Sequence, residues 1–473
     1  MNCRGFFGKI LPAIFVAAIV LTQANPLLSS AAAEEPIISS AGQSPPAEGE
    51  LTLTTAAEIA LRHNPLLQAT SAAEEFAAAQ LSEARAGRWP LLQFNETFTN
   101  GNNPVFVFGS LLEQHRFGLQ NFAIDSLNNP DPLSNFRTAL TLKVPIFDQL
   151  ETGTRVAQAR IGQEQAERQK ELIRQRVRFE VLRAYYGILV AQTRKDVAAE
   201  AVHTAEADVG QIRDRFETGM VVQSDLLAAE VQLAEFRQEE VQAAGDLVTA
   251  YAFLNTALGV PVQTPQKVTH LPVDKTFPVP EPEDLIRTAL LHRPDYARAK
   301  FSVQSAEEKV RGARGQYLPK LDLFSTYGMS SRDLVSGTPD YAIGAGLTYN
   351  LFDLGRGAKL DQARAAQSLA TSEQEHLANQ IRLEVVRTYQ QFVSARERLA
   401  LASRAVDQAE EALRIVRDRY QGGLLIITEV LRAQTALVRA RLNLLAARYD
   451  YFLSYAQILL ASGRLTDVQP FDS

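Results

Sequence analysis

The sequence predicts an α+β fold in which a strand hairpin and a long helical hairpin each occur twice. Apolar and small residues recur with alternating gaps of four and three from Val177 to Phe216, and the pattern returns 204 residues later, from Ile381 to Tyr420. A 3.5-residue period of this length is typical of supercoiled helices that pack against other helices. Ahead of each helical stretch the apolar period is two, which predicts strands with one apolar and one polar face.

The first residues have the features of a secretory signal peptide over residues 1–33. Basic residues precede an apolar run from Ile10 to Leu21, and small residues follow up to Ala33. The run is shorter than the ~20 residues of a spanning helix, which disfavours the alternative of a membrane anchor. The only cysteine, Cys3, would leave with this peptide, so neither disulfides nor lipid attachment is expected.

The first repeat is expected over residues 51–259, after a flexible leader over 34–50 that is rich in Pro, Ser and Ala. The Asn64-Pro65 pair separates two short helices, because Asn caps a helix start and Pro suits the first helical position. The strands form a hairpin over 91–147. The long helix and its returning partner form a helical hairpin over 155–258.

The second repeat follows the first at two different offsets. Ala289 to Pro294 matches Ala60 to Pro65 at an offset of 229, which falls to 204 beyond the strands. The difference of 25 places an insertion in the first strand-to-strand loop, over about 101–135, where a surface tip tolerates added residues. A proline-rich segment over 260–285 precedes the second repeat, which is expected over 286–464. This repeat contains a strand hairpin over 320–352 and a helical hairpin over 356–462, and a tail follows over 465–473.

The charge and hydropathy of the chain narrow its environment. A net charge of -6 without a basic stripe argues against nucleic acid as a partner. No stretch after the signal peptide is apolar enough to cross a bilayer as a helix, so membrane insertion would require strands. Membrane barrels begin at eight strands and one chain supplies four, so closure would need two, three or four copies. The alternative is a soluble sheet buried between subunits.

Both long helices end in the same motif. Arg213-Asp214-Arg215-Phe216 precedes Gly219 and Ser224-Asp225, and Arg417-Asp418-Arg419-Tyr420 precedes Gly423 and Thr428-Glu429. With the doubled architecture, the Asn-Pro and Arg-Pro helix starts and the Leu-Pro strand entries, the chain resembles the TolC-type outer-membrane efflux protein family from about Leu51 to Arg464. The resemblance implies a homotrimer whose twelve strands form one β-barrel in outer-membrane lipid. Twelve helical columns would continue it as a tunnel across the periplasm, with the proline-rich segment and the tail as a belt around its middle.

The resemblance implies a passive exit channel of a tripartite efflux or type I secretion system, without a cofactor. An inner-membrane transporter would drive export through a periplasmic adaptor, also called a membrane fusion protein. No phosphate-binding loop, nucleophile motif or metal motif occurs, so neither an enzyme nor a self-powered pump is expected. His63 and His292 occupy matching repeat positions but have no second metal ligand nearby in sequence. The alternatives are a coiled-coil structural or adhesive surface protein without a conduit, and a porin, which has no use for long helices.

Acidic residues just after the hairpin turns are candidates for a channel constriction. Three copies of Asp225 and Glu429 around a narrow passage would favour cations, although acidic residues also suit a first helical turn, with Ser224 and Thr428 as its N-caps. The resemblance places an acidic gate ring in the second hairpin, where Glu429 matches its first position. Arg432 stands at the next position, which argues against a strongly cation-selective gate.

Charged and glycine residues at the hairpin tips form a second candidate group. They are consistent with a solvated cluster of ion pairs, each worth little. The resemblance implies instead that such residues link neighbouring hairpins in a closed state, that the tip glycines meet an adaptor, and that opening untwists the inner hairpins. The group consists of Arg213, Asp214, Arg215, Gly219, Arg417, Asp418, Arg419 and Gly423.

Overall fold

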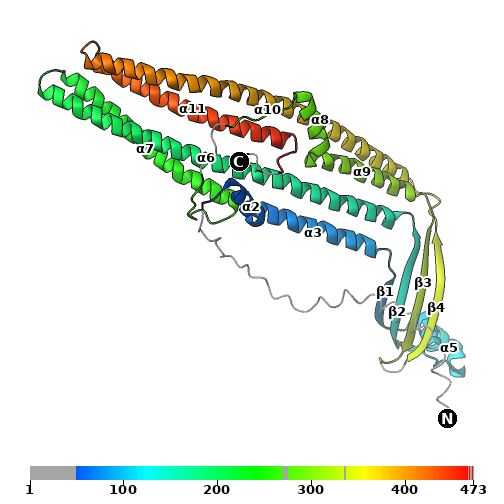
Figure 1. The fold of residues 1–473 in the computed structure, drawn as a ribbon. Helices are drawn as coiled ribbons and strands as arrows, with labels where there is room; N and C mark the ends of the chain where they lie inside the picture. Colours follow the sequence, from blue (N-terminus) through cyan, green and yellow to red (C-terminus); the bar gives the residue numbers. More distant parts are fainter. Residues whose placement is uncertain (1–49, 270–274, 335–336, 467, 469–470, 472–473) are drawn as a thin grey trace. The chain divides into compact units, whose positions relative to one another are not determined.

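The computed structural model describes residues 50–269, 275–334, 337–466, 468 and 471, all within one compact unit. The expected signal peptide, and all of the expected leader except Glu50, lie outside these residues. Within the unit, long helices run side by side and a four-stranded sheet lies at one end of them (Figure 1).

The two repeats are visible in the order of the elements. The first contains α2 (Leu53–His63), α3 (Pro65–Ala86), β1 (Leu91–Gly101), β2 (Leu133–Asp148), α6 (Glu151–Glu217) and α7 (Gln223–Leu258). The second contains α8 (Pro282–His292), α9 (Pro294–Gly315), β3 (Lys320–Ser331), β4 (Gly337–Thr348), α10 (Gly355–Gln421) and α11 (Ile427–Ala461). Between β1 and β2, the insertion forms α4 (Pro104–Glu113), the 3₁₀ helix η1 (Leu119–Phe122) and α5 (Ile124–Asn128).

Local sequence explains where several helices begin. The Asn64 side chain caps α3 by accepting a hydrogen bond of 2.9 Å from the Leu66 N–H. Pro282 opens α8, so this helix starts inside the segment that we expected to be proline-rich and irregular up to residue 285. A proline costs no hydrogen bond at the first helical position, because the N–H there has no partner within the helix.

The sheet has the order β1-β2-β3-β4, and all its neighbours are antiparallel. The register sets Phe94 opposite Leu140 and Phe98 opposite Phe136, so the alternating pattern produces one apolar face. On this apolar face, Phe94 is 69% exposed and Tyr341 is 77% exposed. Such exposure of large side chains indicates a surface that faces lipid or another subunit.

The other face of the sheet is polar. Arg137 of β2 pairs in register with Ser330 of β3 and donates hydrogen bonds to Ser330 and to Asp340 of β4. Glu96, the acidic exception on the apolar face, accepts a hydrogen bond of 2.6 Å from the Thr138 hydroxyl.

The main apolar core lies where the short helices, the long helices and two irregular segments meet. Leu51, Val268 and Phe277, which lie outside the helices, are buried in this core together with residues of the C-terminal tail. The Phe277 N–H donates a hydrogen bond to the Tyr451 hydroxyl, and its ring stacks on Tyr455 at 4.1 Å between centroids. The tail contributes Leu465, Val468 and Phe471, each at most 2% exposed.

The same junction closes each repeat. The side chain of Asn64 donates a hydrogen bond of 2.9 Å to the Ala257 carbonyl in the last turn of α7. At the matching position, Arg293 donates a hydrogen bond of 3.2 Å to the Ala461 carbonyl in the last turn of α11. Each short helical pair is therefore fastened to the end of the returning helix.

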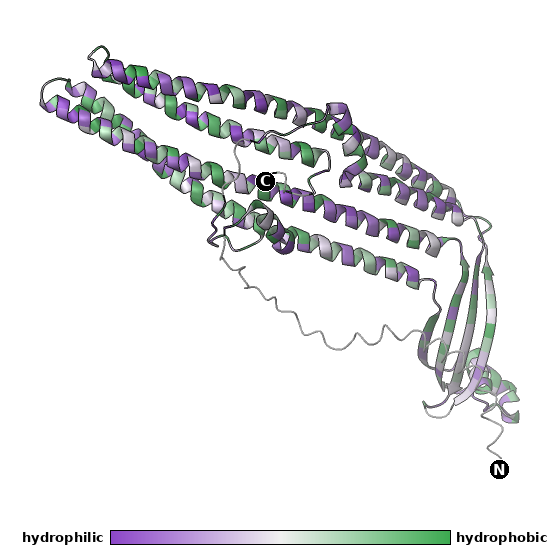
Figure 2. Cartoon of the chain, viewed as in Figure 1, coloured by the Kyte–Doolittle hydropathy of each residue, from purple (hydrophilic) through white to green (hydrophobic). Residues whose placement is uncertain are grey.

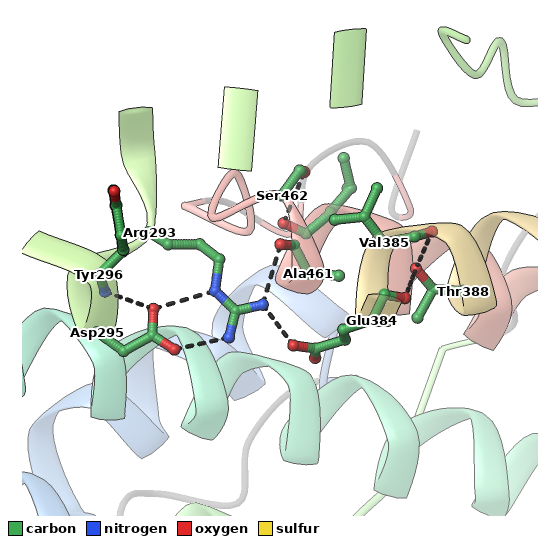
Figure 3. A network of polar contacts seen from close by, with 9 residues as sticks. Arg293, Asp295, Tyr296, Glu384, Val385, Thr388, Ala461 and Ser462 are labelled. Atoms are coloured by element: carbon green, nitrogen blue, oxygen red, sulfur yellow. Dashed lines mark hydrogen bonds and ion pairs between the residues drawn. The ribbon is translucent and has the colours of Figure 1, made fainter. Parts of the chain in front are cut away.

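Arg293 also holds a partly buried ion-pair network (Figure 3). Its guanidinium binds Asp295 through hydrogen bonds of 3.0 and 2.7 Å, and it binds Glu384 of α10 at 2.6 Å. Burial would raise the pKa of the Asp295 carboxyl, but the hydrogen bonds and charge of Arg293 outweigh burial and hold this pKa below its ordinary value. The network joins α9, α10 and α11 at one point.

Acid should weaken this junction. Because the folded-state pKa of Asp295 is depressed, its carboxylate contributes stability above about pH 4, the unfolded-state pKa, and loses it as pH falls through the lower folded value. We expect the melting temperature of the purified protein to fall less steeply below about pH 4 in Asp295→Asn than in the wild type. At neutral pH the variant should be less stable by about 1–3 kcal/mol. Asp284→Asn, which removes an exposed pair with Arg287, is the control, and parallel curves for wild type and Asp295→Asn would contradict the assignment.

Candidate functional site at the tips of the helical hairpins

The turns at both hairpin tips have the same backbone geometry. Gly219 and Gly423 adopt φ values of +76° and +72°, a region that favours glycine. Met220 N donates to Arg215 O at 2.8 Å and Gly219 N donates to Phe216 O at 2.9 Å, which is a Schellman motif. A Cβ at either glycine would meet nothing within 4 Å, so both tips are open surfaces.

The equivalent arginines of the two repeats make different contacts. Arg213 of α6 pairs at 2.9 Å with Glu230 of α7, inside its own hairpin. Arg417 of α10 instead lies 3.9 Å from Asp208 of α6, in the other hairpin. The offset of 204 explains this difference, because the residue at the position of Glu230 in the second repeat is Gln434. Arg417 thus has no acidic partner at that position of its own hairpin.

Asp208 is the centre of the contact between the two hairpins. Gln434 of α11 also donates a hydrogen bond to its carboxylate, so α6, α10 and α11 all meet there. The Asp208 side chain is 18% exposed, which reduces the screening of its charge by water.

Two further contacts made by arginines join the hairpins, beside the buried hydrogen bond of 3.3 Å that Gln232 of α7 donates to the Leu431 carbonyl of α11. The guanidinium of Arg215 lies over the Tyr420 ring, 5.0 Å from its centroid. Arg441 of α11 bridges Glu200 of α6 at 3.1 Å and Glu410 of α10 at 3.0 Å. The contacts at Asp208, Tyr420 and Arg441 are called the hairpin links below.

An apolar cluster and an unfilled space also lie between the two hairpins. Val209, Ile212, Tyr420, Val430 and Leu431 form a small buried core near the tips, separate from the main core. Farther from the tips, a cleft of about 240 Å³ lies between the hairpins and is bordered by Arg417, Gln434 and Arg441, among other residues. Apolar contacts also join the hairpins beside this cleft, where Val438 of α11 packs against a cluster that contains Ala201 and Phe236.

The remaining candidate residues of the tips do not join the hairpins in the contacts that the structure describes. The Asp214 carbonyl accepts hydrogen bonds from the Thr218 N–H and hydroxyl, which close the last turn of α6. Asp418 pairs with Arg414 at 3.0 Å on its own helix. The Arg419 carbonyl accepts the Leu424 N–H in the second Schellman motif.

The acidic residues after the turns lie in first helical turns, but their neighbours are not the caps that we predicted. Val222 and Ile426, in extended conformations, are the N-cap residues, so Ser224 and Thr428 already lie inside α7 and α11. Glu429 pairs with Arg432 at 2.9 Å on one helix, and its side chain is 41% exposed. The positive charge of Arg432 therefore partly neutralises the carboxylate that we expected to line a constriction.

Sequence reasoning missed the partners of the candidate residues: Asp208, Gln434, Tyr420, Arg441 and Glu200. The sequence does contain a signal for the first two. At the offset of 204, Asp208 corresponds to Ala412 and Glu230 corresponds to Gln434. At each of these two positions the first repeat has an acidic residue and the second repeat has none. Such differences between repeats mark places where the two hairpins have different contacts.

Other features of the described residues bear on function. No group of His, Cys, Asp and Glu side chains among them is arranged to hold a metal ion. The Nδ1 atoms of His63 and His292 lie 3.1 and 3.0 Å from carbonyl oxygens one turn earlier. Within the described part of the chain, no helix combines the length and apolarity needed to span a membrane, and Figure 2 shows hydrophilic and hydrophobic residues mixed along the long helices.

Comparisons with known proteins agree on one family. A family model described as "Outer membrane efflux protein" matches residues 56–260 and 285–464. The chain is 28% identical over 323 residues to the outer membrane protein TolC of Vibrio cholerae, which covers 65% of this chain and 72% of that protein. It is 24% identical to the alkaline protease secretion protein AprF of Pseudomonas aeruginosa, with 70% of each chain covered. The CmeC outer membrane channel of Campylobacter jejuni has the same fold, with a TM-score of 0.75, 18% identity, and coverage of 88% of this chain and 86% of that chain.

Proposed function

Because the chain belongs to the outer membrane efflux protein family, we propose that it is the passive exit channel of a tripartite exporter, with the hairpin links as its periplasmic gate. The protein is an outer-membrane channel of the efflux and type I secretion class, and it works as a trimer together with an inner-membrane pump. The family consists of channel proteins and not of enzymes. A periplasmic adaptor would connect the pump to the open turns at Gly219 and Gly423.

The sheet supports assembly from several copies. Within the described sheet, β1 and β4 each have one neighbour, so each offers an unpaired edge. An unpaired edge in lipid costs several kcal/mol for each unsatisfied backbone group. Three copies would pair β1 of one subunit with β4 of the next and close a twelve-stranded barrel with its apolar face toward lipid.

The hairpin links support a gate at the opposite end. The links are polar and partly exposed and they border a cleft, whereas the buried core that contains Ile212 and Val430 also joins the hairpins, so the links supply one part of the energy that holds the gate closed. In the closed state the links hold α10 and α11 against α6. Breaking them would let the second hairpin move outward and widen the passage between the tips.

The test of this function is reconstitution. The mature protein, purified in detergent, should migrate as a trimer that heat dissociates, and it should conduct ions in planar bilayers. A trimer without conductance would favour a structural or adhesive stalk. A water-soluble monomer would contradict both the channel and the stalk.

Selectivity should depend on the acidic residues after the turns. We expect Glu429→Ala to reduce the cation preference of the channel, because three carboxylates leave the constriction. The change should be modest, since Arg432 already pairs with Glu429 at 2.9 Å. By contrast, Arg432→Ala should increase the cation preference by freeing the carboxylates. The measurement is the reversal potential in a salt gradient, and an unchanged value in both variants would exclude a ring at this position.

A further inference from the structure

Residues 104–128, called the exit segment here, form α4, η1 and α5 at the sheet end away from the long helices (Figure 1). They belong to the part of the first repeat that has no counterpart in the second. We propose, on the basis of the channel function above, that the exit segments of three subunits meet over the outer mouth of the barrel. There they form an apolar constriction, a second barrier at the exit.

Buried polar contacts fasten the end of α4 to the sheet. The Gln114 side chain is 7% exposed and donates hydrogen bonds to Ser134 O at 3.1 Å, to Asn135 Oδ1 at 2.8 Å and to Ser331 O at 3.3 Å. Glu113 accepts a hydrogen bond of 2.8 Å from the Ser330 hydroxyl. These contacts reach β2 and β3, so the exit segment is attached to the strands and not only to its own loop.

The attachment is on the polar face of the sheet. Glu113 also lies 3.9 Å from Arg137, whose side chain shares that face with Ser330 and Asp340. The exposed aromatic residues Phe94 and Tyr341 lie on the opposite face. When the apolar face contacts lipid, the polar face lines the interior of the barrel, and the exit segment lies on the interior side.

Several large apolar side chains of the exit segment are exposed, next to polar and charged ones such as Arg116 and Asp125. Leu119 is 89% exposed, Phe122 62% and Ile124 78%, although other residues of the segment pack among themselves, as in the Phe117–Phe122 ring contact at 5.1 Å. Exposed apolar side chains of this size at one place indicate a contact surface.

Charge and composition favour another copy of the segment over lipid as the occupant. Between Phe117 and Pro130 the only charged residue is Asp125, so copies can approach without strong repulsion. Residues that anchor segments at a membrane surface are Lys, Arg, Trp and Tyr, and of these the exit segment contains only Arg116, whose guanidinium donates a hydrogen bond of 3.0 Å to the Gln114 side chain. A ring of apolar side chains resists the passage of water and ions until cargo displaces it.

Cysteine crosslinking tests the contact directly. In a Cys3→Ser background, Leu119→Cys and Ile124→Cys should give crosslinked subunit dimers on denaturing gels after oxidation or treatment with a short bismaleimide. Tyr327→Cys, 54% exposed on the apolar face of the central strand β3, should stay uncrosslinked. A conducting trimer in which Leu119 and Ile124 give no crosslinks would overturn the proposal while leaving the channel function intact. Absence of any trimer would instead remove the channel function itself.

Conductance tests the barrier. In the wild type, the closed periplasmic gate would limit the conductance and hide any effect of the exit segment. The conductance is therefore measured in the Arg417→Glu variant, in which this gate is expected to be open. There, combined Leu119→Ser and Ile124→Ser should raise the single-channel conductance above that of Arg417→Glu alone, and Tyr327→Ser should not. Equal conductance with and without the serines would exclude a barrier. A nitroxide spin label at residue 119 reports its surroundings by electron paramagnetic resonance. If oxygen accelerates the relaxation of the label and a water-soluble nickel complex does not, the segment lies in lipid, which would also overturn the proposal.

Discussion

Replacing Arg417 with glutamate is expected to raise the leak conductance of the channel strongly in planar bilayers. The substitution places a negative charge about where Arg417 now lies 3.9 Å from Asp208, and the attraction becomes a repulsion. Because the Arg417 side chain is 39% exposed, water screens this effect to about 1 kcal/mol in each subunit. Summed over a trimer, this shifts a closed-to-open equilibrium about 100-fold.

The second repeat offers a matched control for this experiment. Arg414 has the same charge three residues earlier on α10, but the pairs that it forms among the described residues are with Glu411 and Asp418 of its own helix. Arg414→Glu should therefore leave the leak conductance near the wild-type value. Adding Asp208→Arg to Arg417→Glu should restore closure by reversing the pair, and a leak that is unchanged in Arg417→Glu would refute the gate assignment.

The second large effect is expected for Gly259→Ala, which should destabilise the helical part by about 2–4 kcal/mol. A Cβ at Gly259 would lie 2.5 Å from the His63 carbonyl oxygen and 2.8 Å from the Asn64 Cα. Both contacts are with backbone, which cannot rotate away as a side chain could. The substitution should therefore separate the short helices from the end of α7.

Gly219→Ala is the control that distinguishes the steric clash at Gly259 from the backbone strain of a positive φ. Gly219 has the same φ of +76°, but a Cβ there would meet nothing within 4 Å. It should cost only about 1 kcal/mol, the ordinary penalty of a left-handed conformation. The measurement is the free energy of unfolding from the helical circular dichroism signal in guanidinium chloride. Equal losses in the two variants would mean that the close approach at Gly259 is unimportant.

Periodicity made most of the fold predictable. The seam from Val177 to Phe216 lies within α6, and the strand alternation around Phe136 gives the face that the register shows. Both signals are local and repeated, so each repeat supports the interpretation of the other. The resemblance to the efflux family was confirmed by the family match over both repeats.

The insertion and the link partners were harder to predict. Residues 101–135 were expected to form a loop, because the second repeat offers no template for them. Yet Asn103 and Pro104 have the same Asn-Pro pattern that starts α3, and the Asn103 side chain caps α4 by accepting hydrogen bonds from the N–H groups of Val105 and Phe106. Asp208 was missed for another reason, because its partners Arg417 and Gln434 are more than 200 residues away and only tertiary packing brings them near.

The single-neighbour strands β1 and β4 have a consequence for biogenesis. A monomer would expose two unpaired edge strands, to which any other extended chain could pair, and this favours aggregation. Folding of the strands and association of the subunits must then be one cooperative event. In a cell that makes both wild-type and mutant chains, one mutant subunit would disrupt the two strand pairings that it forms with wild-type subunits of the same trimer. Mutations that damage β1 or β4 should therefore be dominant over the wild-type allele.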